Sequence, residues 1–225
     1  ALGTRNLFSA STVDQRPKEL ATAWLFGSGL TVAVPDLDRT QYLLVLGANP
    51  YASNGSLATA PDWPGRIEAI RARGGKVVVV DPRRSRTAEE ADWHLAIRPG
   101  TDALLLAAVV TTLAEAGRID CGAAGECVRG LDEVLAALAP FTAESVAATV
   151  GLDAADIRRL AAELADAPTA VTYGRMGTTT AEFGTVASWL VEVSRVGGLE
   201  RHSPGFELTV RVRIIHALVR RALQE

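Results

Sequence analysis

Two short apolar runs constrain the fold of this chain more than any other feature. They cover residues 42–46 (YLLVL) and 76–80 (KVVVV), and neither alternates between apolar and polar residues. Unbroken apolar runs of this length are typical of strands buried on both faces, as in parallel sheets covered by helices. A helical segment between the two runs completes a β-α-β unit, and residues 93–97 supply a further strand. The sequence therefore predicts an α/β protein, a Rossmann-like three-layer domain with a mostly parallel sheet and right-handed crossovers.

The other elements are predicted from helical periodicity and from residues that begin or end helices. Asp62, followed by Trp63 and Pro64, is typical of an N-cap with proline in the first turn. Thr87 and Glu90 have the T-x-x-E spacing of a capping box. The predicted helices cover residues 17–26, 62–73, 102–116, 131–138, 153–165 and 180–193, and one more strand covers residues 169–173.

Composition and charge exclude several classes of protein. The 225 residues are 48% hydrophobic, which is enough for one substantial domain. A net charge of −3 gives no general attraction to nucleic acid or to an anionic membrane, so local groups must hold any anionic ligand. No apolar run reaches the roughly 18–20 residues of a membrane helix, and no signal peptide opens the chain. We therefore expect no nucleic-acid partner, no membrane segment and a cytoplasmic location. Because the first residue is not Met, we expect a fragment or a processed product.

Cysteine and histidine are too sparse to predict a metal cluster. Cys121 and Cys127 lie six residues apart, which is neither a C-x-x-C motif nor a zinc pattern. A reduced, structural pair is the favoured interpretation, and a disulfide or a metal role remains open. The three histidines, at positions 94, 202 and 216, are scattered along the chain.

The turn after the first strand is the first candidate site. Gly47 allows the backbone to approach a ligand closely, and Pro50 fixes the turn. The amide of Asn49 can both donate and accept hydrogen bonds, and Ser53 adds a donor. The alternative is that Asn-Pro simply opens a loop. The ordinary G-x-G-x-x-G fingerprint of dinucleotide sites is absent.

Two further turns carry carboxylates. Asp81 ends the second strand, where this class of fold recognises a ribose diol, and the nearby arginines could neutralise phosphates. A solvated basic turn that caps a helix is the structural alternative. Asp102 ends the third turn, where it could cap a helix, accept hydrogen bonds from a purine, or do both. Since the carboxyl ends of parallel strands meet at one edge of a sheet, the three turns together predict a nucleotide-shaped ligand there.

Three runs carry a resemblance to a known family. They are GANPYAS (47–53), VVVDPRRSRTAEEADWHLAIRPGTDALLLAA (78–108) and YGRMGTTTAEFGT (173–185). In order and spacing they closely resemble the molybdopterin-guanine-dinucleotide oxidoreductases of the dimethyl sulfoxide reductase family, which includes formate dehydrogenases and nitrate or thiosulfate reductases. The likeness covers about residues 3–200. It implies a dinucleotide-binding α/β domain over residues 1–200, like the central domain of those enzymes, and a divergent C-terminal tail over residues 201–225.

The resemblance also implies roles for residues at matching positions. It places the pyrophosphate, the nucleoside, the guanine and the pterin at four successive turns of the chain. The implied cofactor-binding residues are Gly47, Asn49, Pro50 and Ser53; Asp81, Pro82, Arg83 and Ser85; Gly100 and Asp102; and Met176, Gly177 and Thr180. Asp14 stands where the family carries a protein ligand to the metal, and its structural alternative is an N-cap for the helix near Pro17.

The implied function is two-electron redox chemistry on a small substrate at a molybdenum or tungsten centre held by molybdopterin guanine dinucleotide. The family's 4Fe-4S cluster would lie in a part of the parent protein absent from this chain, so the fragment is expected to be inactive alone. Its expected partners are the small-molecule substrate, the missing domains of the same polypeptide and an electron-transfer subunit. Two alternatives stay open: a non-catalytic relative, like the large iron–sulfur subunit of respiratory complex I, and an NAD-type nucleotide-binding domain.

Overall fold

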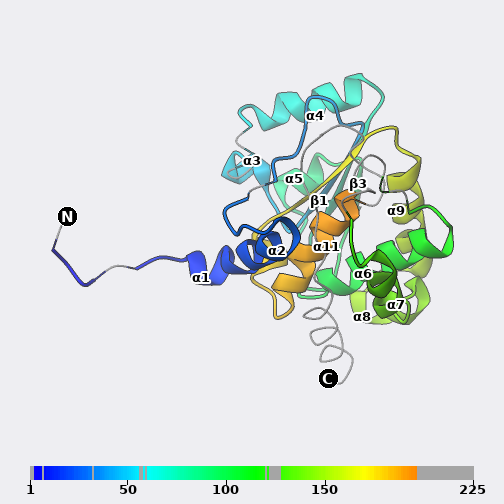
Figure 1. The fold of residues 1–225 in the computed structure, drawn as a ribbon. Helices are drawn as coiled ribbons and strands as arrows, with labels where there is room; N and C mark the ends of the chain where they lie inside the picture. The colour runs from blue at the N-terminus through cyan, green and yellow to red at the C-terminus, as the bar shows by residue number, and fades with distance from the viewer. Residues whose placement is uncertain are drawn as a thin grey trace.

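The four strands of this protein form one parallel sheet, covered by helices on both faces (Figure 1). The structure is a computed structural model that describes residues 3–6, 8–31, 33–55, 58, 60–119, 121 and 128–196, without the side chains of 195 and 196. The strands are β1 (Tyr42–Leu46), β2 (Lys76–Val80), β3 (Trp93–Leu95) and β4 (Ala170–Gly174). They lie in the order β3-β2-β1-β4, and every pairing is parallel. The predicted α/β class with a parallel sheet is therefore confirmed.

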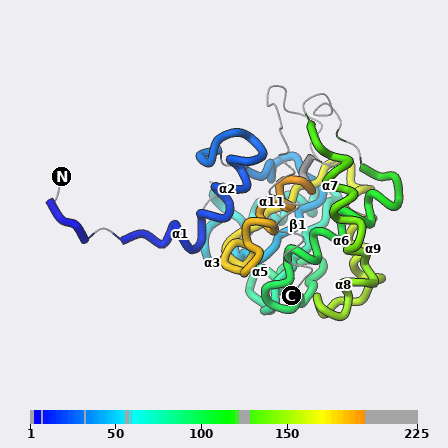
Figure 2. Tube along the Cα trace, turned by 60° about the horizontal axis from the view of Figure 1, so that its bottom comes forward, coloured from blue at the N-terminus to red at the C-terminus, as the bar shows by residue number. Residues whose placement is uncertain are grey.

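Eleven helices are present in the described part of the chain, several of them a single turn. They are α1 (Ser11–Asp14), α2 (Arg16–Phe26), α3 (Pro50–Ser53), α4 (Trp63–Ala72), α5 (Arg86–Glu89), α6 (Asp102–Glu115), α7 (Leu131–Leu138), α8 (Ala143–Val150), α9 (Ala154–Asp166), α10 (Met176–Thr179) and α11 (Gly184–Val196). The N-terminal segment before α1 extends away from the rest of the fold in both ribbon and tube views (Figures 1 and 2).

The strands place alternate side chains in two separate cores. Leu44, Leu46 and Val80 point into a large core that also contains residues of α2, α6, α8, α9 and α11. Val45 and Val79, one position along, point into a smaller core that contains Trp63, Ile67 and Ile70 of α4. Because successive side chains of a strand point to opposite faces, an unbroken apolar run fills both cores at once. This is why residues 42–46 and 76–80 lack alternation.

Helix α9 shows the predicted apolar stripe. Ile157, Leu160, Ala161 and Leu164 are all fully buried in the large core. Their spacing of three and four residues puts them on one side of the helix, which packs against α6 and α8. The Asp62 cap is also confirmed, since its side chain accepts a hydrogen bond from Gly65 N at the start of α4.

Several predicted boundaries are wrong. The last helix begins at Gly184 rather than residue 180, because α10 ends in a separate turn in which Thr180 N and Oγ1 both donate to Met176 O. The T-x-x-E capping box is also wrong: Ser85, not Thr87, occupies the N-cap of α5 and accepts from Ala88 N. Helix α8 was not predicted. Cys127 and the tail from residue 201 lie outside the described residues, so the domain boundary near residue 200 stays a prediction.

Among the helices that the structure describes, none alone has the length and apolar composition to cross a membrane. The pair α7 and α8 meets those two criteria when taken together across a bend of 61°.

A charged cluster ties α9 to the amino end of the sheet. Glu163 of α9 accepts hydrogen bonds from Tyr42 Oη at 3.1 Å, from Lys76 Nζ at 2.6 Å and from Arg159 Nε at 2.8 Å. The Lys76 and Arg159 cations lie 5.1 and 4.3 Å from the ring centroid of Trp93. Burial alone would raise the pKa of Glu163, but the hydrogen bonds from Lys76 and Arg159 outweigh it and lower that pKa.

Replacing Glu163 by Gln should lower the free energy of unfolding by about 1 kcal/mol at pH 7, since three donors then face a neutral amide. A lowered folded-state pKa stabilises the protein above the unfolded value, and this stabilisation is lost as the pH falls through the folded value. The difference between wild type and variant should therefore shrink below about pH 4. Urea unfolding at pH 7 and at about pH 3 measures the difference. Glu68→Gln, on the exposed side of α4, is the matched control. If Glu163→Gln and Glu68→Gln lose the same free energy of unfolding, the hydrogen bonds of Glu163 do not stabilise the fold.

Candidate functional site

The candidate site lies at the carboxyl edge of the sheet, where the chain changes direction. From β1 the chain proceeds through β2 to β3 on one side, and then returns to place β4 on the other side of β1. The connections after β1 and β4 therefore leave the sheet toward opposite faces. In open α/β sheets, ligands bind in the crevice that this reversal creates. The predicted turns after β1, β2, β3 and β4 all meet at this edge.

The turns after β1 and β4 touch through two glycines. Gly47 adopts a φ of +53°, and a Cβ added there would lie 2.6 Å from Gly177 Cα. A Cβ on Gly177 would in turn lie 2.6 Å from Gly47 Cα, and Gly177 N donates to Gly47 O at 2.9 Å. Only glycine at both positions permits this approach of backbone to backbone. The sequence predicts both glycines as site residues but does not predict their contact.

Asn49 is held in place by a residue that the sequence analysis assigned to a cap. Its Oδ1 accepts a hydrogen bond of 2.7 Å from Thr87 Oγ1, and its backbone O accepts from Ser53 N at 3.0 Å. Pro50 is buried at the start of α3, whereas Ser53 is exposed at its end. The hydroxyl of Thr87 thus links Asn49, in the turn after β1, to helix α5, which follows the turn after β2.

The turn after β2 is organised by Asp81. Its Oδ1 accepts from Arg83 N at 2.8 Å, and its backbone O lies 2.8 Å from His94 Nε2. His94 is thus a support for this turn that the sequence analysis did not assign. Pro82 and Arg83 are exposed, and the buried Ser85 hydroxyl is engaged in capping α5.

Asp102 is a buried carboxylate in the first turn of α6. Thr101, not Asp102, occupies the N-cap position and makes no side-chain cap hydrogen bond, so the predicted capping role of Asp102 is wrong. The physical reason is that Thr101 Oγ1 donates instead to Arg98 O at 2.7 Å, which closes the turn around Gly100. Only 5% of Asp102 is exposed. The carboxylate is therefore held at the site without serving the helix cap.

The pKa of Asp102 links it to Asp81. Burial raises this pKa from 3.8 to about 6; the hydrogen bond from its own backbone N–H lowers it, and the charge of Asp81 raises it. The charge of Asp81 is the smallest of these three causes, so the carboxylates that follow β2 and β3 are within electrostatic range of each other. A carboxylate pair of this kind accepts hydrogen bonds from a ligand with several N–H or O–H groups.

The turn after β4 presents Met176 to solvent, with 50% of the residue exposed. Thr178 Oγ1 donates to Arg175 O at 2.7 Å, and Thr180 Oγ1 donates to Met176 O at 2.7 Å. These two hydroxyls stabilise the short helix α10. Met176 and Gly177 are therefore the residues of this turn that lie open to a ligand.

Asp14 lies against the same end of β4. It lines a cavity of about 180 Å³ together with Gly174, Arg175 and Thr179. Helix α2 has Gln15 at its N-cap with no side-chain cap hydrogen bond, so the alternative role of Asp14 as a cap is wrong. Its Oδ1 is buried and has no hydrogen-bond partner among the described residues. A buried carboxylate oxygen without a donor is costly unless a cation, a proton or water meets it.

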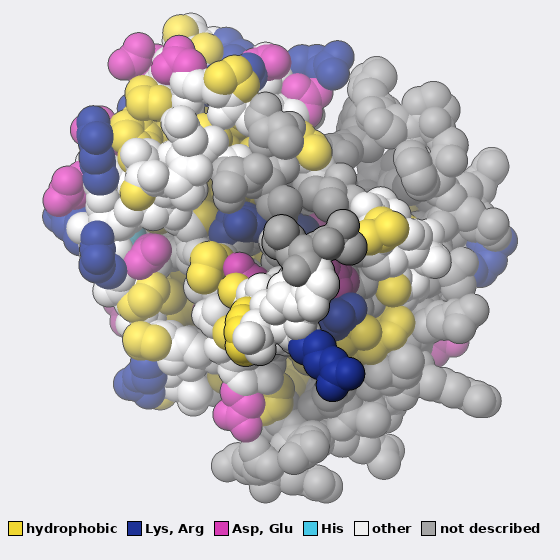
Figure 3. Space-filling model, turned by 90° about the vertical axis from the view of Figure 1, so that its left-hand side faces the viewer, with side chains coloured by type: hydrophobic (Ala, Val, Ile, Leu, Met, Phe, Trp, Pro, Cys, Tyr) yellow, Lys and Arg dark blue, Asp and Glu magenta, His cyan; other side chains and the backbone are white. Residues whose placement is uncertain are grey.

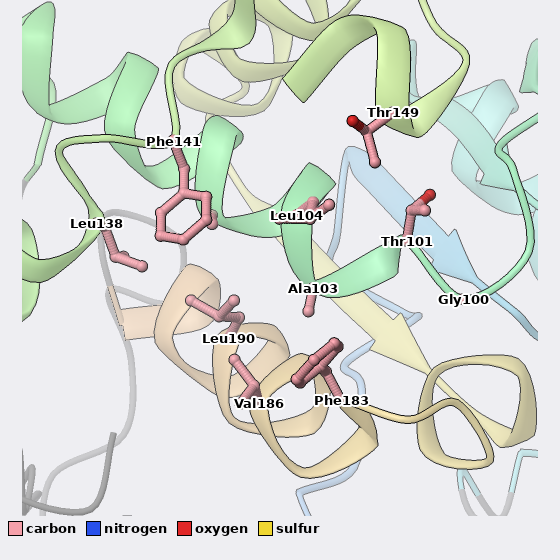
Figure 4. Close-up of a pocket in the computed structure, with 11 residues that line it drawn as sticks. Gly100, Thr101, Ala103, Leu104, Leu138, Phe141, Thr149, Phe183, Val186 and Leu190 are labelled. Atoms are coloured by element: carbon pink, nitrogen blue, oxygen red, sulfur yellow. The ribbon is translucent and has the colours of Figure 1, made fainter. Parts of the chain in front are cut away.

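A second cavity, of about 220 Å³, lies below the Gly100–Thr101 turn (Figure 4). Side chains of α6 and α11 face each other across it, and the rings of Phe141 and Phe183 lie towards its two ends. Thr101 and Thr149 contribute its hydroxyl groups, and the other side chains of the lining are apolar. Asp102 does not line it, so the cavity is separate from the carboxylate pair.

The charges on one face of the molecule are mixed in sign. On the face shown in Figure 3, Lys and Arg side chains are interspersed with Asp and Glu. Within the described ranges, no group of three or more His, Cys, Asp or Glu residues could hold a metal ion. A metal at Asp14 would therefore need its other ligands from outside the described residues.

Comparison with curated proteins gives relatives of one kind. The assimilatory nitrate reductase of Haloferax mediterranei is 33% identical over 83% of this chain and 25% of its own length. The probable oxidoreductase YjgC of Bacillus subtilis is 32% identical over 79% of this chain and 18% of its own length. Formate dehydrogenase H of Escherichia coli is 28% identical over 79% of this chain and 24% of its own length. The chain thus spans a quarter or less of the length of these relatives.

A solved structure and a family model give results consistent with these relatives. The solved structure of acetylene hydratase from Pelobacter acetylenicus superposes with a TM-score of 0.70 at 24% identity, over 87% of this chain and 26% of that chain, which shows the shared fold. A model of the family described as Molybdopterin oxidoreductase matches residues 4–196. The match covers nearly the whole described part of the chain, including every turn of the candidate site. This protein belongs to the molybdopterin oxidoreductase family.

Proposed function

We propose that this chain binds the guanosine diphosphate end of molybdopterin guanine dinucleotide within a molybdenum or tungsten oxidoreductase. The observation that carries the proposal is the buried carboxylate of Asp102, which follows β3 at the same edge of the sheet where Asp81 follows β2. A guanine base offers adjacent imino and amino N–H groups, which one carboxylate can accept together. A ribose offers two hydroxyls to the second carboxylate, which is the usual role of an acidic residue after the second strand.

The phosphates would lie between these carboxylates and the turn after β1. Asn49 contributes an amide there, and Arg83 and Arg84 have exposed side chains that form no ion pair with another described residue. Charge-assisted hydrogen bonds from arginine suit a pyrophosphate. The contact between Gly47 and Gly177 leaves backbone, without side chains, beneath the middle of the ligand.

The metal end fits the residues near β4. The buried, unpartnered Oδ1 of Asp14 supplies a hard oxygen ligand of the kind that a high-valent metal prefers, and Met176 and Gly177 lie open to the pterin. When bound, the cofactor supplies the two-electron chemistry, and this chain's residues hold and orient it. The unpartnered Oδ1 and the position of Asp14 near the turn after β4 both support our proposal that Asp14 is the metal ligand.

The activity of the whole protein is also a proposal. We infer a small-molecule substrate, contacts with further domains, and an electron-transfer partner. A 4Fe-4S cluster would need its ligands elsewhere, because this chain has two cysteines and a cubane cluster takes four. The family match favours this interpretation over an NAD-type domain.

Nucleotide binding to the full 225-residue chain tests the proposal. We expect calorimetric titration to show tighter binding of GDP than of ADP, because adenine lacks the two adjacent donors. Asp102→Asn, which can accept only with one oxygen, should lower the affinity for GDP by about tenfold and abolish the preference. Asp132→Asn, in the first turn of α7 and exposed, is the matched control. Equal binding of GDP and ADP by wild type would refute the guanine assignment, and binding of neither would favour the non-catalytic alternative.

A further inference from the structure

Thr87 joins the turn after β1 to the turn after β2. The residue is fully buried, and its Oγ1 makes two hydrogen bonds that cross between these turns. It donates to Asn49 Oδ1 at 2.7 Å and accepts from Tyr51 N at 3.3 Å. Helix α5 needs neither bond, since Ser85 caps it. The hydroxyl of Thr87 therefore serves the β1 turn rather than its own helix.

The two bonds together fix which way the Asn49 amide points. A hydroxyl carries one proton and can accept as well. The backbone N–H of Tyr51 can only donate, so Thr87 Oγ1 must accept there, and its proton goes to Asn49. Asn49 turns its carbonyl oxygen toward Thr87, because with the amide reversed the proton of this buried hydroxyl would lose its acceptor among the described residues. Its Nδ2 donors consequently face away from Thr87, and no described residue accepts a hydrogen bond from them.

We propose that Thr87 is a positioning residue that orients the Asn49 amide so that its two N–H donors face the phosphates of the ligand. This inference rests on the proposed function, because it names what Asn49 presents to that ligand. Without Thr87 the amide could rotate by half a turn and present its carbonyl oxygen. An oxygen acceptor repels a phosphate oxygen, whereas an N–H group binds it. The turn after β2 thus sets the chemistry of the turn after β1.

A pair of substitutions separates the hydroxyl from the shape of Thr87. Thr87→Val keeps the shape but removes the hydroxyl, and Thr87→Ser keeps the hydroxyl. In calorimetric titrations of the full chain, Thr87→Val should lower the affinity for GDP by about fivefold, the loss of one hydrogen bond, and leave the affinity for guanosine unchanged. Thr87→Ser should restore GDP binding. Guanosine is the necessary comparison, because it carries the base and ribose without phosphates.

A double-mutant cycle shows whether Thr87 acts through Asn49. In an Asn49→Ala background, Thr87→Val should cause no further loss of affinity for GDP, because the amide that it orients is absent. The same substitution should still lower the urea midpoint, since Tyr51 N then lacks its acceptor. A merely structural role would weaken GDP binding in both backgrounds.

The polarity of the amide gives an independent readout. Asn49→Asp keeps the shape and still accepts the proton of Thr87, but it presents a carboxylate oxygen in place of the N–H donors. It should therefore lower the affinity for GDP more than Asn49→Ala does, while guanosine binding stays as in wild type. Equal effects of the two substitutions would contradict the proposed orientation.

The outcomes distinguish the two proposals. If wild type fails to bind GDP, the proposed function itself is wrong. If wild type binds GDP and Thr87→Val binds it equally well, only the role of Thr87 is overturned. Fully additive losses from Thr87→Val and Asn49→Ala would overturn it too, because the two residues would then act separately.

Discussion

Replacing Gly47 by alanine should lower the free energy of unfolding by about 3 kcal/mol and abolish GDP binding. The residue has a φ of +53°, where a Cβ is strained, and the new Cβ would lie 2.6 Å from Gly177 Cα. The backbone strain costs about 1–2 kcal/mol and the forced separation of the turns a similar amount. Since Gly177 N also bonds to Gly47 O, separating the turns breaks that hydrogen bond. Urea unfolding and a GDP titration measure the two effects.

Two control substitutions separate the two causes of the lost stability, backbone strain at Gly47 and the clash with Gly177. Gly117→Ala has a similar φ of +63° but no atom within 4 Å of the new Cβ, so it should show the strain alone. Gly177→Ala lacks the positive φ and should show the clash alone, with the same loss of GDP binding. If Gly47→Ala costs no more stability than Gly117→Ala, the contact between the turns does not matter to the fold.

Replacing Asp102 by Asn should stabilise the ligand-free protein above pH 6. Burial and the charge of Asp81 raise the pKa of Asp102 from 3.8 to about 6, so its ionised form is disfavoured in the folded state. That difference corresponds to at most about 3 kcal/mol at pH 7. A negative charge in the first turn of α6 is favourable by up to about 1 kcal/mol, and the variant gives this up. We therefore expect a net gain of about 1–2 kcal/mol.

The sign of this effect fixes its dependence on pH. A folded-state pKa above the unfolded value means that the folded protein holds the proton more tightly, so the wild type loses stability as the pH rises from about 4 to about 6. The advantage of the variant should therefore be full at pH 7.5 and shrink toward pH 4.5. Urea unfolding at both values measures it. Asp132→Asn, the exposed counterpart, should change stability by at most about 0.5 kcal/mol at either pH. A variant less stable than wild type at pH 7.5 would show that Asp102 is not held at a cost.

We expect Asp102→Asn to raise the free energy of unfolding and to lower the affinity for GDP. Asp102 would then be a residue that improves ligand binding but destabilises the ligand-free fold. A neutral Asn packs more favourably in the empty site, and a carboxylate binds guanine more favourably. Loss of binding in a more stable protein could not be attributed to unfolding. The comparison therefore separates the role of the side chain from the integrity of the fold.

The sheet was predictable because its signals are local. Residues 42–46 and 77–80 do not alternate between apolar and polar, and burial on both faces of the sheet explains that pattern. The stripe on α9 was equally clear, since Ile157 and Leu160 repeat at helical spacing. The sequence predicted the wrong role where one sequence pattern is compatible with two structures. Thr87 has the spacing of a cap, but its hydroxyl is used by Asn49, and Ser85 two residues earlier does the capping.

The site was predictable as a place but not as an arrangement. Parallel strands end at the same edge, so the turns that contain Asn49, Asp81 and Asp102 had to meet there. Which atoms meet depends on packing between residues distant in the sequence, such as Gly47 against Gly177 or Asn49 against Thr87. For the same reason the sequence predicts no role for His94 and the wrong role for Thr87, since the hydrogen-bond partners of both residues lie in other turns.

The contact between Gly47 and Gly177 also limits how this site can evolve. The two turns are separated by 130 positions in the chain, yet their backbones touch, so neither can lengthen or shorten without displacing the other. One turn faces the nucleotide end and the other the metal end of the proposed ligand. New chemistry would therefore have to come from side chains at the rim, such as Met176, or from other parts of the protein. The spacing between the two ends of the ligand would be inherited unchanged.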